Sequence, residues 1–293
     1  RSPMSAILGF TDIALRDLRD GQPIEQEHLE TVIRNGRFLL RIINDILDLS
    51  KVEAGKLQVH RTVFKLMPML ADLLDLMRHK SKSSDVPLTI EFDGQVPSQI
   101  YSDRSRVEQI LVNLIGNAIK FTPRGNVRLV VSSDSSHVIF RVIDTGIGIS
   151  ERKIEHLFQA FSQVHDSTKL VGIEGTGLGL VISKRLASLL NGDIDVQSVE
   201  GEGSVFSLRL AIGDVAPLEM LQPGPLELKP RPTTTKSFAR IRGRVLVADD
   251  ARDVRHVTRH FLTRAGAEVV EVVNGAEAVA AVREAEAVGD QFV

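Results

Sequence analysis

The chain has 293 residues, of which 43% are hydrophobic and 25% charged, and its formal net charge is −2. This balance gives no sign of a nucleic-acid or polyanion surface, and the absence of cysteine excludes disulfides and thiolate chemistry and fits a cytoplasmic setting. No run reaches the ~18 apolar residues that a bilayer span requires, so no membrane segment is expected.

Residues 1–54 are predicted to form two helices, with a break at the Gly-Gln-Pro sequence of residues 21–23. On the second helix, apolar residues and one glycine recur at spacings of four and three, a heptad seam made of Leu29, Ile33, Gly36, Leu40, Ile43 and Leu47. One interpretation of this pattern is a plain helical hairpin packed on its own domain.

Residues 55–213 predict an α+β sandwich, in which helices pack on one face of a mixed sheet. Strands are expected at residues 57–64, 88–92, 126–132, 138–143, 193–198 and 204–210. A helix is expected at residues 66–79, and another carries the first candidate site.

Polar side chains share one face of that second helix. Gln109, Asn113, Asn117 and Lys120 are spaced at i, i+4, i+8 and i+11. Amide oxygens suit Mg²⁺, and a lysine on the same face can offset phosphate charge. A solvated polar face is the alternative, although such faces more often carry Glu and Lys.

A carboxylate closes the strand at residues 138–143. Asp144 can accept a hydrogen bond from the exocyclic amino group of adenine, and Gly146 and Gly148 let the backbone turn closely beneath a flat ligand. The alternative is an ordinary Asp-x-Gly turn.

A glycine-rich run opens onto a third helix, and its residues are Gly175, Thr176, Gly177, Leu178 and Gly179. Backbone N–H groups at such a helix start bind phosphate. The run is neither a P-loop nor a dinucleotide fingerprint, because it lacks the following Gly-Lys-Ser/Thr and a directly preceding strand. Taken with the two earlier segments, it indicates an ATP site with Mg²⁺.

After residue 213 the amino-acid composition of the chain changes. Residues 214–243 contain five prolines and are predicted to be an extended linker. A buried strand at residues 244–248 ends in Asp249 and Asp250, and a helix, a strand and a second helix follow. Paired carboxylates at the carboxyl end of a strand suit Mg²⁺, and exposed acidic residues are the alternative.

The three ordered segments resemble the N, G1 and G2 boxes of sensor histidine kinases, within the wider family of Bergerat-fold ATPases. Residues 158–161 lie where that family has its F box, and Gly203 and Ser204 lie where a further glycine motif is expected. The resemblance implies that Asn117 is the main Mg²⁺ ligand with Asn113 nearby, and that Lys120 faces the phosphates.

It also implies that Phe121 faces the adenine ring, that Asp144 takes the adenine amino group, and that Gly146 and Gly148 shape that floor. The glycine-rich run would be the phosphate end of a mobile lid spanning about residues 150–174. Glu174 departs from the family pattern, which usually has glycine at that position, and this leaves the behaviour of the lid open.

The beginning of the chain, Arg-Ser-Pro-Met, resembles the tail of the H box. This implies that residues 1–54 are the dimerisation and phosphotransfer helices of an intersubunit four-helix bundle. The phosphoaccepting histidine is then expected before Arg1 and outside this chain. None of the 8 histidines present is expected to replace it: His28, His60, His79, His137, His156, His165, His256 and His260.

Residues 244–293 resemble the first half of a response-regulator receiver domain. The resemblance implies that Asp249 and Asp250 help to hold Mg²⁺ beside a phosphoaccepting Asp at the end of a third strand. Residues 291–293 are expected to begin that strand, and the acceptor is expected beyond them.

These observations predict the core of a hybrid sensor histidine kinase, cytoplasmic in this part, with membrane anchoring of the parent left open. The expected parts are a hairpin (1–54), an ATP-binding catalytic domain (55–213), a linker (214–243) and a partial receiver domain (244–293). The expected partners are a second copy and a receiver domain or response regulator, without nucleic acid. The alternatives are a non-kinase ATPase of the same superfamily and a signalling scaffold with a degenerate site.

Overall fold

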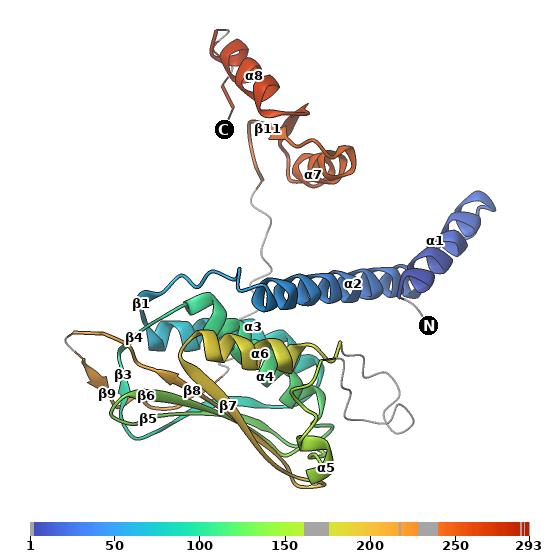
Figure 1. Cartoon of the computed structure of the whole chain (residues 1–293). Helices are drawn as coiled ribbons and strands as arrows, with labels where there is room; N and C mark the ends of the chain where they lie inside the picture. Colours follow the sequence, from blue (N-terminus) through green and yellow to red (C-terminus); the bar gives the residue numbers. More distant parts are fainter. Residues whose placement is uncertain are drawn as a thin grey trace. The chain divides into compact units, whose positions relative to one another are not determined.

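A computed structural model describes residues 3–160, 176–216, 218–227, 240–287, 289 and 291–292. The chain divides into two compact units, Arg1–Leu228 and Lys229–Val293, and each is described by itself (Figure 1).

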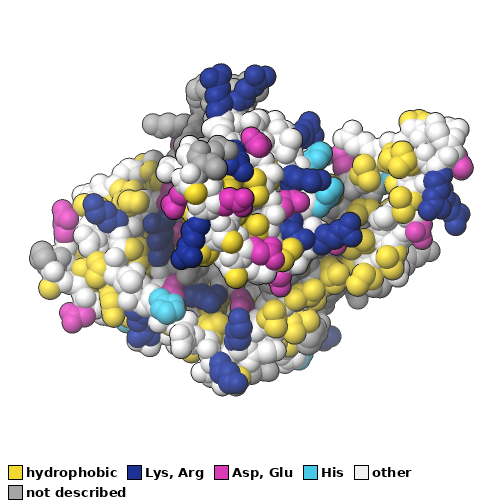
Figure 2. Space-filling view, turned by 90° about the horizontal axis from the view of Figure 1, so that it is seen from above, with side chains coloured by type: hydrophobic (Ala, Val, Ile, Leu, Met, Phe, Trp, Pro, Cys, Tyr) yellow, Lys and Arg dark blue, Asp and Glu magenta, His cyan; other side chains and the backbone are white. Residues whose placement is uncertain are grey.

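The first unit begins with the predicted hairpin. Helices α1 (Pro3–Arg19) and α2 (Gln26–Glu53) pack against each other, and Gly21 turns the chain between them with φ of 69°. The apolar seam of α2 stays open to solvent, since the side chains of Ile33 and Leu40 are 51% and 62% exposed. Hydrophobic side chains follow this hairpin, at the right of Figure 2.

The predicted α+β sandwich is confirmed. Its six-stranded sheet has the order β10-β2-β5-β6-β8-β7, with β2 parallel to β5 and every other pair antiparallel. The strands are β2 (Leu88–Asp93), β5 (Val127–Ser133), β6 (His137–Asp144), β7 (Gly192–Val199), β8 (Gly203–Ala211) and β10 (Leu226–Glu227).

Three helices cover one face of this sheet: α3 (Leu66–Ser83), α4 (Arg104–Lys120) and α6 (Gly179–Leu189) (Figure 1). Alternate residues of the strands are buried against them, with Phe140 of β6 and Ile90 of β2 fully enclosed. This core fixes where α4 and the end of β6 meet.

Short elements complete the unit: β1 (Thr62–Lys65) pairs with β4 (Gln99–Ser102), β3 (Val96–Pro97) pairs with β9 (Met220–Leu221), and α5 is Glu151–Ile154. Of the strand expected at residues 57–64, only the last residues form a strand, as part of β1. Before β1, the His60 N–H donates to the Asp103 carboxylate (2.9 Å) and not to a neighbouring strand.

The segment 218–227, expected within the linker, instead lies along the sandwich. It supplies β9 and β10, and β10 pairs with the edge strand β2. Leu226 packs against the hydrophobic core, and the Ser98 N–H donates to the Glu219 carbonyl (2.7 Å). The high proline content of residues 214–243 as a whole predicts an extended linker, and the few apolar residues of this short segment do not change that average. Residues 228–239 lie outside the described part of the chain.

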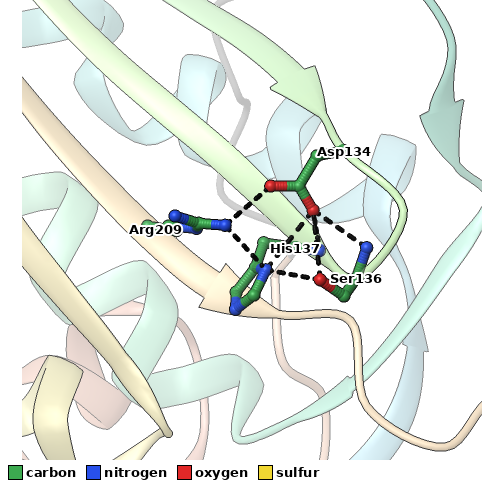
Figure 3. A network of polar contacts seen from close by, with 4 residues as sticks. All are labelled: Asp134, Ser136, His137 and Arg209. Carbon is green, nitrogen blue, oxygen red and sulfur yellow. Dashed lines mark hydrogen bonds and ion pairs between the residues drawn. The ribbon is translucent and has the colours of Figure 1, made fainter.

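A polar network closes the turn between β5 and β6 (Figure 3). Asp134 Oδ1 accepts from the backbone N–H of Ser136 (2.9 Å) and of His137 (2.7 Å), and Arg209 of β8 donates to Asp134 Oδ2 (2.8 Å). These contacts, with the Ser136 N–H contributing most, hold the pKa of Asp134 well below its usual range. The network ties β8 to the turn at one end of the sheet.

The second unit contains β11 (Arg244–Ala248), α7 (Arg252–Arg264), β12 (Glu268–Val272) and α8 (Gly275–Ala287). The two strands are parallel, and Phe292 forms a parallel bridge with Arg244, consistent with a third strand beginning there. The strand β11 was expected to be buried, but it is only half-buried. Among the described residues of this unit, Ala267 and Ala285 are the only buried hydrophobic residues.

Across the described residues of both units, no helix combines the length and apolar character needed to cross a membrane.

Candidate functional site

The first candidate segment lies on α4, which Asp103 caps at its N-terminus. The carboxylate accepts from the Arg106 N–H (3.2 Å), the Ser105 hydroxyl (2.7 Å) and the His60 N–H (2.9 Å). Burial by itself would raise the pKa of Asp103, but these hydrogen bonds outweigh it and lower the pKa. Asp103 therefore stays ionised and fixes the start of α4, the helix that carries Asn113 and Asn117.

Asn113 joins α4 to α6. Its Nδ2 donates to Ser183 Oγ (2.9 Å), and Ser183 is 2% exposed. A Cβ at Gly179 would lie 2.5 Å from Asn113 Oδ1, so any larger residue there would force the Asn113 side chain to shift. Asn113 is thus placed beside the start of α6, where its amide already has a protein partner.

The other polar residues of this face lie at the end of α4. Asn117 is half-buried, and the Lys120 ammonium lies 4.8 Å from the centroid of the Phe121 ring. The Phe121 carbonyl accepts from the Ile147 N–H (3.1 Å). This bond attaches the end of α4 to the loop that follows Asp144.

Asp144 ends β6 and is 6% exposed. Its Oδ1 accepts from the Gly146 N–H (2.9 Å), and Ser204, its register partner on β8, bonds to it through backbone and side chain. Burial raises the pKa of Asp144, and the hydrogen bonds from Gly146 and Ser204 oppose that effect. A desolvated carboxylate of this kind can accept a hydrogen bond from a ligand amino group.

Glycines permit the close backbone approaches around Asp144. A Cβ at Gly146 would collide with the Phe121 carbonyl, and one at Gly203 would collide with the Asp144 carbonyl. Gly148 adopts φ of 63°, and a Cβ there would collide with the Val199 carbonyl. The predicted floor residues Gly146 and Gly148 therefore lie in close backbone contact with the end of α4 and the end of β7, respectively.

The glycine-rich run is described from Thr176 onward, and Gly175 lies outside the described residues, as do Glu174 and most of the predicted lid. Gly177 adopts φ of 70°, and the side chain of Leu178 is fully buried. The helix α6 begins at Gly179, so the last glycine of the run is already the first residue of the helix that the run was expected to precede.

Two serines near these residues were not found by sequence reasoning. Ser183 holds Asn113, and Ser198 Oγ accepts from the Ile149 N–H (2.8 Å) and contacts Ser204 Oγ (2.9 Å). The only available signal was a small polar residue on an otherwise apolar face, and that pattern is common in cores. Their role follows from tertiary contacts.

The described site residues thus form one connected set. Asn113 links α4 to α6, Phe121 links α4 to the loop after β6, and Ser204 links Asp144 at the end of β6 to β8. The set offers a buried carboxylate, amide oxygens, an ammonium group and a helix start. That chemistry suits an adenine nucleotide bound with a hard cation.

Of the paired acids of the second unit, Asp249 uses its carboxylate in local structure. Asp249 Oδ1 accepts from the Ala251 N–H (2.8 Å), and Arg255 donates to the carbonyls of Asp249 (2.7 Å) and Asp250 (3.2 Å). Within the described residues, no three acidic or histidine side chains gather as a metal site. These two carboxylates therefore require further ligands to hold a cation.

Two segments of the chain match models of known protein families. Residues 102–214 match the family model of histidine kinase-, DNA gyrase B- and HSP90-like ATPases, and residues 1–55 match the His Kinase A (phospho-acceptor) domain. The signal transduction histidine-protein kinase BarA of Escherichia coli K12 is 40% identical over 211 residues, which are 70% of this chain and 23% of that relative. The autoinducer 2 sensor kinase/phosphatase LuxQ of Vibrio parahaemolyticus is 34% identical over 292 residues, covering 95% of this chain and 32% of LuxQ.

Among solved structures, full-length ShkA in complex with AMPPNP matches with a TM-score of 0.57 and 24% identity, over 96% of this chain and 57% of that one. The Acinetobacter baumannii histidine kinase AdeS matches with a TM-score of 0.58 and 22% identity, over 73% of this chain and 97% of that one. At these identities the likeness concerns the fold. The chain spans less than two fifths of the length of the curated relatives described above.

Proposed function

Because this chain belongs to the sensor histidine kinases, we propose that it is the kinase core of a hybrid member and transfers the γ-phosphoryl group of ATP to a histidine. The single observation that carries this proposal is the buried Asp144 carboxylate, held beside the end of α4 by the Phe121–Ile147 bond. The work of the protein would be positioning and charge neutralisation, as in phosphoryl transfer generally.

The residues have separate proposed roles. Asp144 would accept the adenine amino group, Phe121 would contact the ring and Lys120 would face the phosphates. Gly177 and Gly179, with Gly175, would bring backbone N–H groups to the phosphates.

Mg²⁺ is proposed to bind through Asn117. The donor set fits this ion, since Asn117 offers a neutral amide oxygen and Mg²⁺ takes its remaining ligands from water and phosphate. Asn113 is less suited as a direct ligand, because it bonds to Ser183 and is pressed against Gly179. The ion would neutralise phosphate charge.

Two macromolecular partners are proposed. The exposed apolar seam of α2 supports a homodimer through the hairpin, as its phospho-acceptor family match would require. A structure with the same fold holds the histidine kinase ThkA in complex with the response regulator TrrA, with a TM-score of 0.54 and 20% identity. A response regulator, or a receiver domain that includes residues 244–293 with Asp249 and Asp250, is the proposed phosphoryl acceptor after histidine.

A phosphotransfer assay tests the proposal. The full chain is mixed with a separate helical hairpin that bears an H-box histidine, because no histidine of this chain is assigned as the acceptor, and γ-labelled ATP is added. Acid-labile, base-stable label on that hairpin is the expected result. Label released only as free phosphate would instead indicate an ATPase that does not act as a kinase.

A further inference from the structure

A polar stripe on α2 (Arg41, Asp45 and Asp48) lies on the face that meets the ATP-binding sandwich. The three residues are spaced at i, i+4 and i+7, so they share one side of the helix. Asp48 Oδ2 accepts from Gln109 Nε2 of α4 (3.0 Å) and lies 3.8 Å from Arg106 Nη1. Burial lowers the pKa of Lys80, and the charge of Arg41 lowers it further.

Asp45, in the middle of this stripe, reaches the glycine-rich run. Thr176 Oγ1 donates to Asp45 Oδ2 (3.0 Å) and accepts from the Leu178 N–H (3.2 Å). Burial raises the pKa of Asp45, and the Thr176 bond and Arg41 oppose this while Asp48 adds to it. A carboxylate is therefore partly withdrawn from water directly beside the start of α6.

These two hydrogen bonds of Thr176 occupy groups that a bound phosphate would need. The Leu178 N–H stands one residue before α6, where backbone donors and the helix dipole favour anions. While Thr176 holds that N–H, it is not available to a phosphate oxygen. The Asp45 charge, 3.0 Å from the Thr176 hydroxyl, would also repel a triphosphate.

We propose that Asp45 is a positioning residue that couples the placement of α2 to nucleotide affinity, by holding Thr176 and Leu178 in an arrangement that disfavours phosphate. The inference rests on the proposed function, because it requires a triphosphate at the glycine-rich run. Formation of the contact between Asp45 and Thr176 then lowers the affinity for nucleotide. By reciprocity, bound nucleotide weakens the α2 contact by the same factor.

Titration of the full chain with AMPPNP and Mg²⁺ tests this coupling by calorimetry. Asp45→Ala removes the contact and the charge, and the expected result is about fivefold tighter binding or more, at the low end of typical coupling factors. Asp45→Asn removes the charge and keeps an acceptor, so its gain is expected to be smaller. Asp17→Asn, on α1, makes the same change in net charge and is expected to leave affinity unaltered.

Amide hydrogen exchange without nucleotide gives a second readout. The Leu178 N–H is expected to exchange faster in Asp45→Ala than in the wild type, because its hydroxyl acceptor is no longer held. Equal AMPPNP affinity of wild type and Asp45→Ala would overturn this inference alone. Absence of binding by both proteins would overturn the proposed function, and this inference with it.

Discussion

At the scale of single residues, the buried carboxylate of Asp144 is the most specific group of the site. It combines burial with fixed donors from Gly146 and Ser204, so its unused lone pairs are oriented before any ligand arrives. A hydrogen bond from an amino group to such a carboxylate is worth about 1.5–3 kcal/mol. Under the proposed role of Asp144, adenine recognition would depend on this one side chain.

Asp144→Asn is expected to weaken binding of an ATP analogue by roughly 10- to 100-fold, because the amide is a poorer acceptor for the adenine amino group. Calorimetric titration measures the change. The control is Asp195→Asn, an exposed residue of β7 that lies outside the site. Similar losses in the two variants would contradict the assignment.

The pH dependence of binding has a definite sign. Burial raises the pKa of Asp144, and the protonated carboxyl can no longer accept from adenine at that oxygen. Affinity should therefore fall as pH decreases, beginning at a higher pH than an ordinary aspartate would give. In Asp144→Asn this pH dependence should disappear, and its persistence would assign the titration to another group.

At the scale of elements, the contact of α4 with α6 determines how the site is held together. Gly179→Ala places a Cβ against Asn113 and is expected to lower the free energy of unfolding by about 1–3 kcal/mol. Gly116→Ala is the matched control within a helix, because its added Cβ meets only the flexible end of Lys80. Thermal unfolding should separate the two variants, and an equal change in Tm would contradict the close packing.

The strand β10 offers a second test at this scale. Leu226→Asp should detach the segment from the edge of β2 and cost about 1–2 kcal/mol of folding free energy. Leu218→Asp, in the same segment but 43% exposed, should cost less. If both variants unfold at the wild-type temperature, the pairing of β10 with β2 contributes nothing.

Sequence patterns could predict the long strands and helices of the sandwich, but not its short strands β3, β4 and β9, because only the long elements carry strong local signals. The alternating burial of β6 and the polar face of α4 follow directly from side-chain periodicity. The pairing of β10 and the contact of Asn113 with Ser183 could not be predicted, since both join residues far apart in the sequence. The same applies to the bond between Asp45 and Thr176, which needs α2 and α6 to meet.

At the scale of the whole molecule, the exposed seam of α2 predicts self-association. Changing Ile33 and Leu40 together to glutamate should shift the protein toward the monomer in sedimentation velocity, because like charges then replace apolar contacts across the bundle. Arg37→Glu, an exposed polar position of α2, is the control and should leave the association state unchanged. A wild type that is monomeric at all concentrations would contradict the proposed dimer.

The measurement that tests the account most directly is a titration of the whole chain with AMPPNP, with and without Mg²⁺. Binding that requires Mg²⁺ and weakens in Asp144→Asn is the expected result, since the amide of Asn117 and the carboxylate of Asp144 would then act on one ligand. A folded protein that binds no nucleotide in either condition would contradict the central claim.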